Sequence, residues 1–160
     1  MAIKVGDRIP PVKVQMMKDG EIKTLSSDDL FKGKKVVLFA LPGAFTPTCS
    51  AQHLPGFIKH AEDIRKKGVD SIACLSVNDA FVMDAWGKDR GAGDKVMMLA
   101  DGNADFSKAV GLTMDATGYG MGLRANRYAM VVEDGVVKKL NVEAPGAFEV
   151  SSAESILRAL

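Results

Sequence analysis

The chain of 160 residues has only two cysteines, almost no net charge and no long apolar run. Two cysteines cannot form the dense disulfide framework of a small secreted domain, so a reducing compartment, the cytoplasm, is expected. The formal net charge of +1 gives no electrostatic reason to bind nucleic acid or an acidic membrane surface. Charged residues interrupt positions 1–8 before a signal-peptide core can develop, and no apolar run approaches the roughly 20 residues of a membrane span.

The composition that remains is typical of one folded domain, with 47% hydrophobic and 26% charged residues. Apolar strand patterns alternate with helical patterns, and short turns containing Asp-Gly join the strands of two hairpins. This order predicts an α/β fold in which helices flank a mixed central sheet and an N-terminal β-hairpin comes first. The expected strands are 12–16, 21–25, 35–41, 71–77, 95–100, 128–132 and 136–142, and the expected helices are 47–67, 79–90, 104–110 and 155–160.

Two of the expected helices carry more detailed predictions. Pro55 lies inside the helical pattern of 47–67 and should bend that helix, because proline lacks an N–H and its ring crowds the preceding turn. In the second helix, 79–90, apolar residues recur at helical spacing and predict one buried face. The members of that face are Phe81, Val82, Ala85 and Trp86.

Two patterns in the last third of the chain predict local structure rather than chemistry. Ser151 and Glu154 have the spacing of a capping box, which predicts a helix start just before the closing helix. The run GYGMG at 118–122 resembles a phosphate loop only in its glycines, because its spacing is different and no strand precedes it. We expect this run to be a flexible turn.

Cys49 has the sequence setting of a reactive thiol. It follows the buried strand pattern of 35–41 and a short turn, and the helix that comes next is expected to open at Pro47 or Thr48. Cys49 then lies in the first helical turn, where unpaired backbone N–H groups and the positive end of the helix dipole favour an anion. An ordinary free thiol is only about 3% ionised at pH 7. The position therefore favours the nucleophilic thiolate over the thiol.

Other interpretations of the two cysteines are open at this point. Free cysteine is often a small buried hydrophobe, and Cys74, in the middle of an apolar strand pattern, fits that description well. A thioredoxin-type exchange site would place a second cysteine at position 52, which is Gln52. Cys49 could also be a redox sensor on a scaffold without turnover.

A metal site and a cysteine hydrolase fit poorly. His53 and His60 follow Cys49 along the same helical pattern, and residues 49 and 60 would lie about 16 Å apart on a straight helix, too far to share one ion. A hydrolase needs a histidine that approaches the thiol from another segment, and the chain has no histidine beyond these two. No metal or other cofactor is expected.

Several runs along nearly the whole chain resemble the peroxiredoxins, in the form of the type II or peroxiredoxin V subgroup. The run PGAFTPTCS at 42–50 is similar to the family motif P-x-x-x-T-x-x-C. Further matches are HLPGF at 53–57, CLSVNDAFV at 74–82 and RYAMVV at 127–132. The closing run VSSAESIL at 150–157 resembles plant and bacterial type II members more than animal ones.

This resemblance implies that residues 1–160 form a single thioredoxin-fold domain with thiol peroxidase activity towards hydrogen peroxide and alkyl hydroperoxides. In the family's pattern Cys49 is the peroxidatic nucleophile and cycles through a sulfenic acid, without metal or haem. Thr46 orients the peroxide, Pro42 shields the thiolate, and Arg127 supplies a fixed positive charge. The hydroxyl of Thr46, three residues before Cys49, is close enough in a tight turn for either the thiolate or a substrate oxygen.

The resemblance also bears on how Cys49 is reduced again. The chain has no cysteine after Cys74, so the C-terminal resolving cysteine of animal members is missing. Cys74 matches the second cysteine of plant members, but its place in mid-strand makes a disulfide with Cys49 difficult, since the Cα atoms must come within about 7 Å. We therefore expect an external thiol as reductant, such as glutathione with glutaredoxin, or thioredoxin. The subgroup also implies a homodimer.

Overall fold

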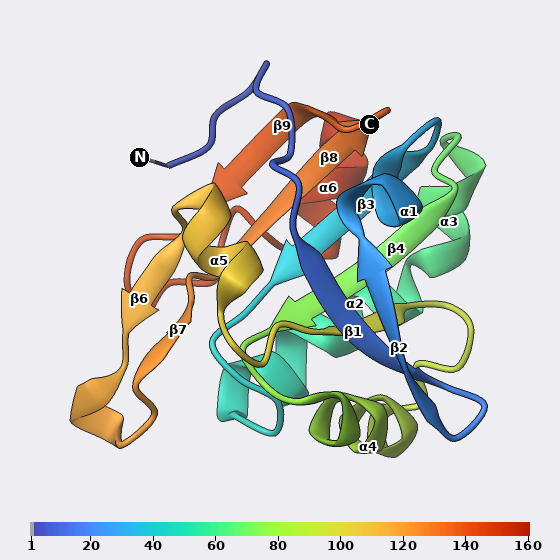
Figure 1. The fold of residues 1–160 in the computed structure, drawn as a ribbon. Coiled ribbons are helices and arrows are strands. Elements are labelled where there is room, and N and C mark those ends of the chain that lie inside the picture. Colours follow the sequence, from blue (N-terminus) through green and yellow to red (C-terminus); the bar gives the residue numbers. More distant parts are fainter. Residues whose placement is uncertain (1) are drawn as a thin grey trace.

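The computed structural model describes residues 2–160, in which seven strands form one sheet with helices on both faces (Figure 1). The strands of this sheet are β1 Lys13–Lys18, β2 Glu21–Ser26, β3 Lys35–Ala40, β4 Ser71–Ser76, β5 Met97–Ala100, β8 Tyr128–Glu133 and β9 Val136–Val142, and a small second sheet contains β6 Thr113–Asp115 and β7 Leu123–Ala125. The helices are α1 Ser27–Phe31, η1 Cys49–His53, α2 Leu54–Lys59, α3 Ala61–Lys66, α4 Ala80–Arg90, α5 Asp105–Val110, η2 Thr117–Tyr119 and α6 Ala153–Ala159.

The main sheet is mixed, as the sequence predicts. Its strand order is β2-β1-β5-β4-β3-β8-β9, with β3, β4 and β5 parallel and β1 and β8 antiparallel to their neighbours. Both expected hairpins are present, and Asp19 and Asp134 at their turns have positive φ angles of 52° and 47°. Each is followed by a glycine with positive φ, which matches the twist of a tight hairpin. Within residues 2–160, no helix is long and apolar enough to cross a membrane.

Two apolar cores form because the central strands are buried on both faces. Phe39 of β3 and Cys74 of β4 point to the face covered by α2, α3, α4 and α6, where the rings of Phe39 and Phe57 stack with centroids 4.0 Å apart. The alternate residues, such as Leu38, point to the other face, which α1 and α5 cover. Cys49 and Cys74 belong to the same core, on the side of the sheet that carries the α2 helix.

The helical segment expected over 47–67 is present, but it is not one regular α-helix. Helical backbone does begin at Pro47, but Cys49–His53 is a π-helix, in which the Leu54 N–H donates to the carbonyl of Cys49. Pro55 has no N–H to continue the regular ladder past this point, and it lies in the first turn of α2 rather than at a bend in mid-helix. The helix breaks instead at His60, whose φ and ψ are −98° and 10°.

Of the predicted buried face of α4, only Trp86 is fully buried. Phe81 is 62% exposed, and the residues that pack on the sheet are Ala80, Met83, Trp86 and Gly87. Small residues let the helix lie close to β5, since a Cβ at Gly87 would meet the Met98 Cγ at 2.7 Å. The close approach of the α4 backbone to the sheet decides which face of the helix is buried. The hydrophobic pattern of the sequence alone does not predict that face.

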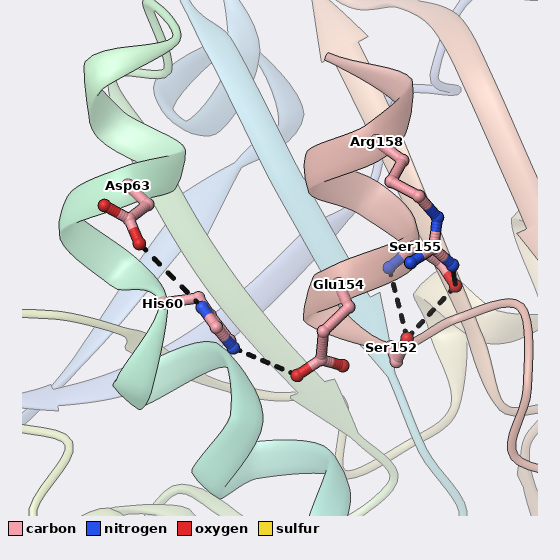
Figure 2. Close-up of polar contacts among 6 residues, drawn as sticks. All are labelled: His60, Asp63, Ser152, Glu154, Ser155 and Arg158. Atoms are coloured by element: carbon pink, nitrogen blue, oxygen red, sulfur yellow. Dashed lines mark hydrogen bonds and ion pairs between the residues drawn. The ribbon is translucent and has the colours of Figure 1, made fainter.

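The closing helix begins at Ala153 rather than at 155, and its N-cap lies one residue later than the capping-box spacing suggests. Ser152 is the N-cap of α6, and its hydroxyl accepts from the Ser155 N–H at 3.2 Å (Figure 2). Figure 2 also shows that α6 is tied to the α2–α3 break, where His60 Nε2 lies 3.0 Å from Glu154. Ser151 is free for another contact, described below. The 118–122 run is a turn, as expected: its first two residues belong to η2, and the rest lead into β7.

Candidate active site

Cys49 lies at the point where β3 leads through a tight turn into η1. The Ala44 N–H donates to Asn78 Oδ1 at 3.0 Å, which ties the turn to the segment after β4. The Ser50 N–H donates to the carbonyl of Thr46 at 2.9 Å and closes the first helical turn. Cys49 is fully buried in this arrangement, at the start of a helix and at the edge of the apolar core. Its thiol is therefore kept from bulk water.

Arg127 reaches Cys49 from the strand that pairs with β3. Tyr128 lies opposite Ala40 in the β3–β8 ladder, so the residue before it stands beside the turn that leads to Cys49. The Arg127 Nη2 donates to Cys49 Sγ at 3.1 Å, and its Nη1 donates to His53 Nδ1 at 2.8 Å. A guanidinium stays charged at all relevant pH values, so Arg127 presents a permanent cation to the sulfur.

Thr46 and Pro42 lie in the turn before Cys49. The Thr46 hydroxyl donates to the carbonyl of Gly43 at 2.7 Å, which leaves its oxygen lone pairs free to accept a hydrogen bond. The Pro42 carbonyl accepts from Arg124 Nη1 at 3.3 Å. Gly43 permits this packing, because a Cβ there would lie 3.1 Å from both the Arg124 Nη1 and the Thr46 Cγ2. The turn therefore offers an acceptor close to a buried thiol and a fixed cation.

The structure also brings His53 into this site, which is not predicted from the sequence. It is fully buried on η1 and lies between the rings of Phe39, Phe57 and Phe148, with centroid distances of 5.0, 5.7 and 5.0 Å. Because Arg127 can only donate, Nδ1 of His53 is the acceptor, and Nε2 carries the proton that it donates to the Ser151 carbonyl at 3.0 Å. From the sequence, His53 is considered only as a metal ligand or a hydrolase base. Its spacing of four residues from Cys49 on a helix indicates that the two side chains lie close together.

Burial, with the adjacent Arg127 charge, lowers the pKa of His53 from 6.5 to about 3. The ring therefore stays neutral at physiological pH and keeps the lone pair that accepts from Arg127. A protonated ring would have no acceptor and would repel the guanidinium. His53 is thus placed to contact Arg127 as a neutral acceptor.

The lowered pKa of His53 predicts a loss of stability in mild acid. Between about pH 6.5 and 3 the unfolded state binds the proton and the folded state does not, so this contribution is complete above pH 6.5 and falls with pH. From pH 6.5 to 5 the expected loss is about 2 kcal/mol of unfolding free energy. Urea unfolding at pH 7 and pH 5 measures it, and His53→Gln should show a shallower pH dependence. Equal slopes in the two proteins would contradict the prediction.

Cys74 has a different environment from Cys49. It lies in mid-strand on β4 opposite Phe39, it is fully buried, and both cysteines are free thiols. Burial, with the nearby Cys49, raises the pKa of the Cys74 thiol well above its usual value. Cys74 therefore remains a protonated, weakly nucleophilic thiol, in agreement with the prediction that it belongs to the core.

Comparisons with known proteins place the chain among named relatives. The sequence model of the family described as Redoxin matches residues 4–157. The chain is 51% identical over 163 residues to peroxiredoxin-2E, chloroplastic, of Arabidopsis thaliana, covering 99% of this chain and 70% of that protein. It is 46% identical to peroxiredoxin-2B of the same plant, covering 99% of this chain and 98% of that protein. The crystal structure of reduced Prx3 from Vibrio vulnificus in complex with H2O2 superimposes with a TM-score of 0.95 at 54% identity, over 98% of each chain.

Proposed function

The chain belongs to the peroxiredoxin family and is a thiol-dependent peroxidase, and we propose that Cys49 is its peroxidatic nucleophile. The observation that carries this proposal is the contact between Arg127 Nη2 and Cys49 Sγ at 3.1 Å. A thiol at a helix start, out of bulk water and beside a permanent cation, has the surroundings that favour the thiolate. Cys74 is also buried, but it lies in mid-strand, and Arg127 donates its hydrogen bond to Cys49.

In the proposed reaction the Cys49 thiolate attacks the terminal oxygen of a hydroperoxide. The S–O bond forms as the O–O bond breaks, so the sulfur is oxidised to a sulfenic acid and the other oxygen leaves as an anion, which is protonated to water or an alcohol. The Arg127 guanidinium stabilises the negative charge as it moves from sulfur to the leaving oxygen. Thr46 orients the peroxide by accepting its O–H, and Pro42 shields the thiolate from water.

We propose that an external thiol, glutathione with glutaredoxin or thioredoxin, returns the sulfenic acid to the thiol. Cys74 is the one other cysteine of the sequence, and its place in the middle of β4 argues against a partner for Cys49 without local unfolding. Its raised pKa also makes it a poor nucleophile towards the sulfenic acid. A small soluble thiol is neither held in the middle of a strand nor kept protonated by burial.

A homodimer is proposed on the basis of large apolar side chains that lie exposed around the active-site turn. Phe45 is 52% exposed in the turn itself, and Phe81 is 62% exposed at the start of α4. Tyr119 is 84% and Leu123 is 40% exposed on the β6–β7 extension, whose Arg124 contacts the Pro42 carbonyl. A second copy of the chain that covered these side chains would remove apolar surface from water.

Native mass spectrometry after one equivalent of hydrogen peroxide, with and without glutathione, tests both proposals. With glutathione we expect one glutathione per chain on Cys49, and without it a gain of one oxygen, both on particles of two chains. An intramolecular loss of two hydrogens would reveal a Cys49–Cys74 disulfide and would contradict the external reductant. Particles of one chain at micromolar concentration would contradict the homodimer.

A further inference from the structure

The segment between β9 and α6 packs against Arg127 and His53. We call residues 144–151 the strap. Phe148 of the strap lies over Arg127, with 5.7 Å from the Arg127 Cζ to the ring centroid, and beside the ring of His53 at 5.0 Å. The Ser151 carbonyl accepts from His53 Nε2 at 3.0 Å. The strap therefore contacts both residues that stand behind the sulfur.

One carboxylate, that of Glu143, holds the end of the strap in place. Its Oε2 accepts the backbone N–H groups of Glu149, Val150 and Ser151 at 2.8, 2.9 and 2.8 Å. The same oxygen accepts the Ser151 hydroxyl at 2.6 Å. Successive N–H groups that converge on one oxygen form an anion-binding nest, here filled by a side chain of the protein itself. Burial works to raise the pKa of Glu143, but these hydrogen bonds, those from Ser151 above all, hold it below its usual value.

Glu143 is also joined directly to the Arg127 backbone. The N–H of Glu143 donates to the carbonyl of Arg127 at 3.0 Å, beyond the last pair of the β8–β9 ladder. The side chain of Glu143 is buried, with 8% of the residue exposed. One residue therefore fixes the strap relative to Arg127 through its backbone on one side and its carboxylate on the other.

We propose that Glu143 is a positioning residue for the peroxidase reaction, acting through the Ser151 carbonyl and His53 on Arg127. The proposal rests on the proposed role of Cys49. With the nest formed, the Ser151 carbonyl requires a proton on His53 Nε2, which leaves Nδ1 as the acceptor for Arg127. If that carbonyl turned away, the proton could move to Nδ1, and His53 could no longer accept from Arg127. Glu143 thus selects the tautomer that holds the guanidinium on the sulfur.

The Glu143→Gln variant tests this chain of contacts, because it keeps the shape of the side chain and removes its charge. We expect about a tenfold lower second-order rate constant for Cys49 with hydrogen peroxide, equivalent to about 1.4 kcal/mol. The ¹⁵N chemical shifts of the His53 ring give a readout that a merely structural role would not move. They should report a single Nε2–H tautomer in the native protein and a mixture in the variant.

Glu154→Gln is the matched control, since Glu154 also lies near the C-terminus and contacts a histidine, His60, at 3.0 Å (Figure 2). This pair makes no contact with Arg127, so the control should keep the native rate and the native His53 tautomer. An unchanged rate and tautomer in Glu143→Gln would overturn the proposal, as would an equal loss in both variants. If Glu143→Gln does not fold, Ser151→Ala, which removes one of the four donors, is measured instead with the same criteria.

Different results would contradict the role of Cys49 as nucleophile and the role of Glu143 as positioning residue. Peroxide turnover that survived Cys49→Ser would remove the proposed nucleophile, whatever the state of His53. A native tautomer in Glu143→Gln would remove the role of the carboxylate and leave Cys49 in place as the nucleophile.

Discussion

Cys49→Ser is expected to abolish peroxide turnover, with a fall of at least about a thousandfold, while Cys74→Ser keeps most of it. A serine hydroxyl remains protonated even beside Arg127 and is a far weaker nucleophile than a thiolate. Serine is also close to cysteine in size, so the buried site should keep its packing. Cys74 lies in the apolar core and makes no contact that the reaction requires. The assay is peroxide consumption with glutathione and glutaredoxin or with thioredoxin.

Stopped-flow oxidation of the two cysteines separates turnover from sensing. In the Cys74→Ser variant, Cys49 should react with hydrogen peroxide much faster than an ordinary free thiol, because the Arg127 guanidinium lies beside the sulfur and meets the leaving oxygen. A rate close to that of free cysteine would favour a sensor or scaffold instead. Activity lost in Cys74→Ser and kept in Cys49→Ser would overturn the assignment.

The strands of the main sheet could be predicted from the sequence, whereas the course of the helix after Cys49 could not. The expected strand at 35–41 is a continuous apolar run between polar ends, and β3 occupies almost the same residues. The break at His60 lies where two helices that are distant in the sequence meet, since His60 Nε2 is 3.0 Å from Glu154 on α6. The local hydrophobic pattern of the sequence predicts burial well where a strand is covered on both faces. It does not predict how two helices pack against each other.

The same difference between local pattern and long-range contact explains which residues of the site could be predicted. Cys49, Thr46 and Pro42 lie in one short run, so a motif identifies them together. The support behind Arg127 comes from the strap, and the His53–Ser151 bond joins positions 98 residues apart. The sequence around His53 and around Ser151 has no local pattern that predicts this contact. A buried histidine that lies between a cation and a backbone carbonyl is visible only once the chain is folded.

Arg127→Ala should cost about a hundredfold to a thousandfold in the rate of Cys49 with peroxide. Loss of one charged donor from a site without bulk water typically has an effect of this size, because no water takes its place with the same orientation. The expected cause has two parts, the loss of the fixed positive charge beside the sulfur and a less stabilised leaving oxygen. Stopped-flow oxidation of Cys49 in the native protein and in the variant measures their combined effect.

Two further variants separate charge from geometry at this position. Arg127→Lys keeps the positive charge but cannot donate at once to Cys49 Sγ and His53 Nδ1 in the fixed geometry of a guanidinium, so an intermediate rate is expected. Arg158→Ala is the matched control. Arg158 lies on α6 and donates a hydrogen bond to Ser155 (Figure 2), so its substitution should leave the rate unchanged. An unaltered rate of Cys49 oxidation in Arg127→Ala would remove Arg127 from the site. A native rate in Arg127→Lys would mean that charge alone is sufficient, and that His53, the strap and Glu143 support the fold without tuning the sulfur.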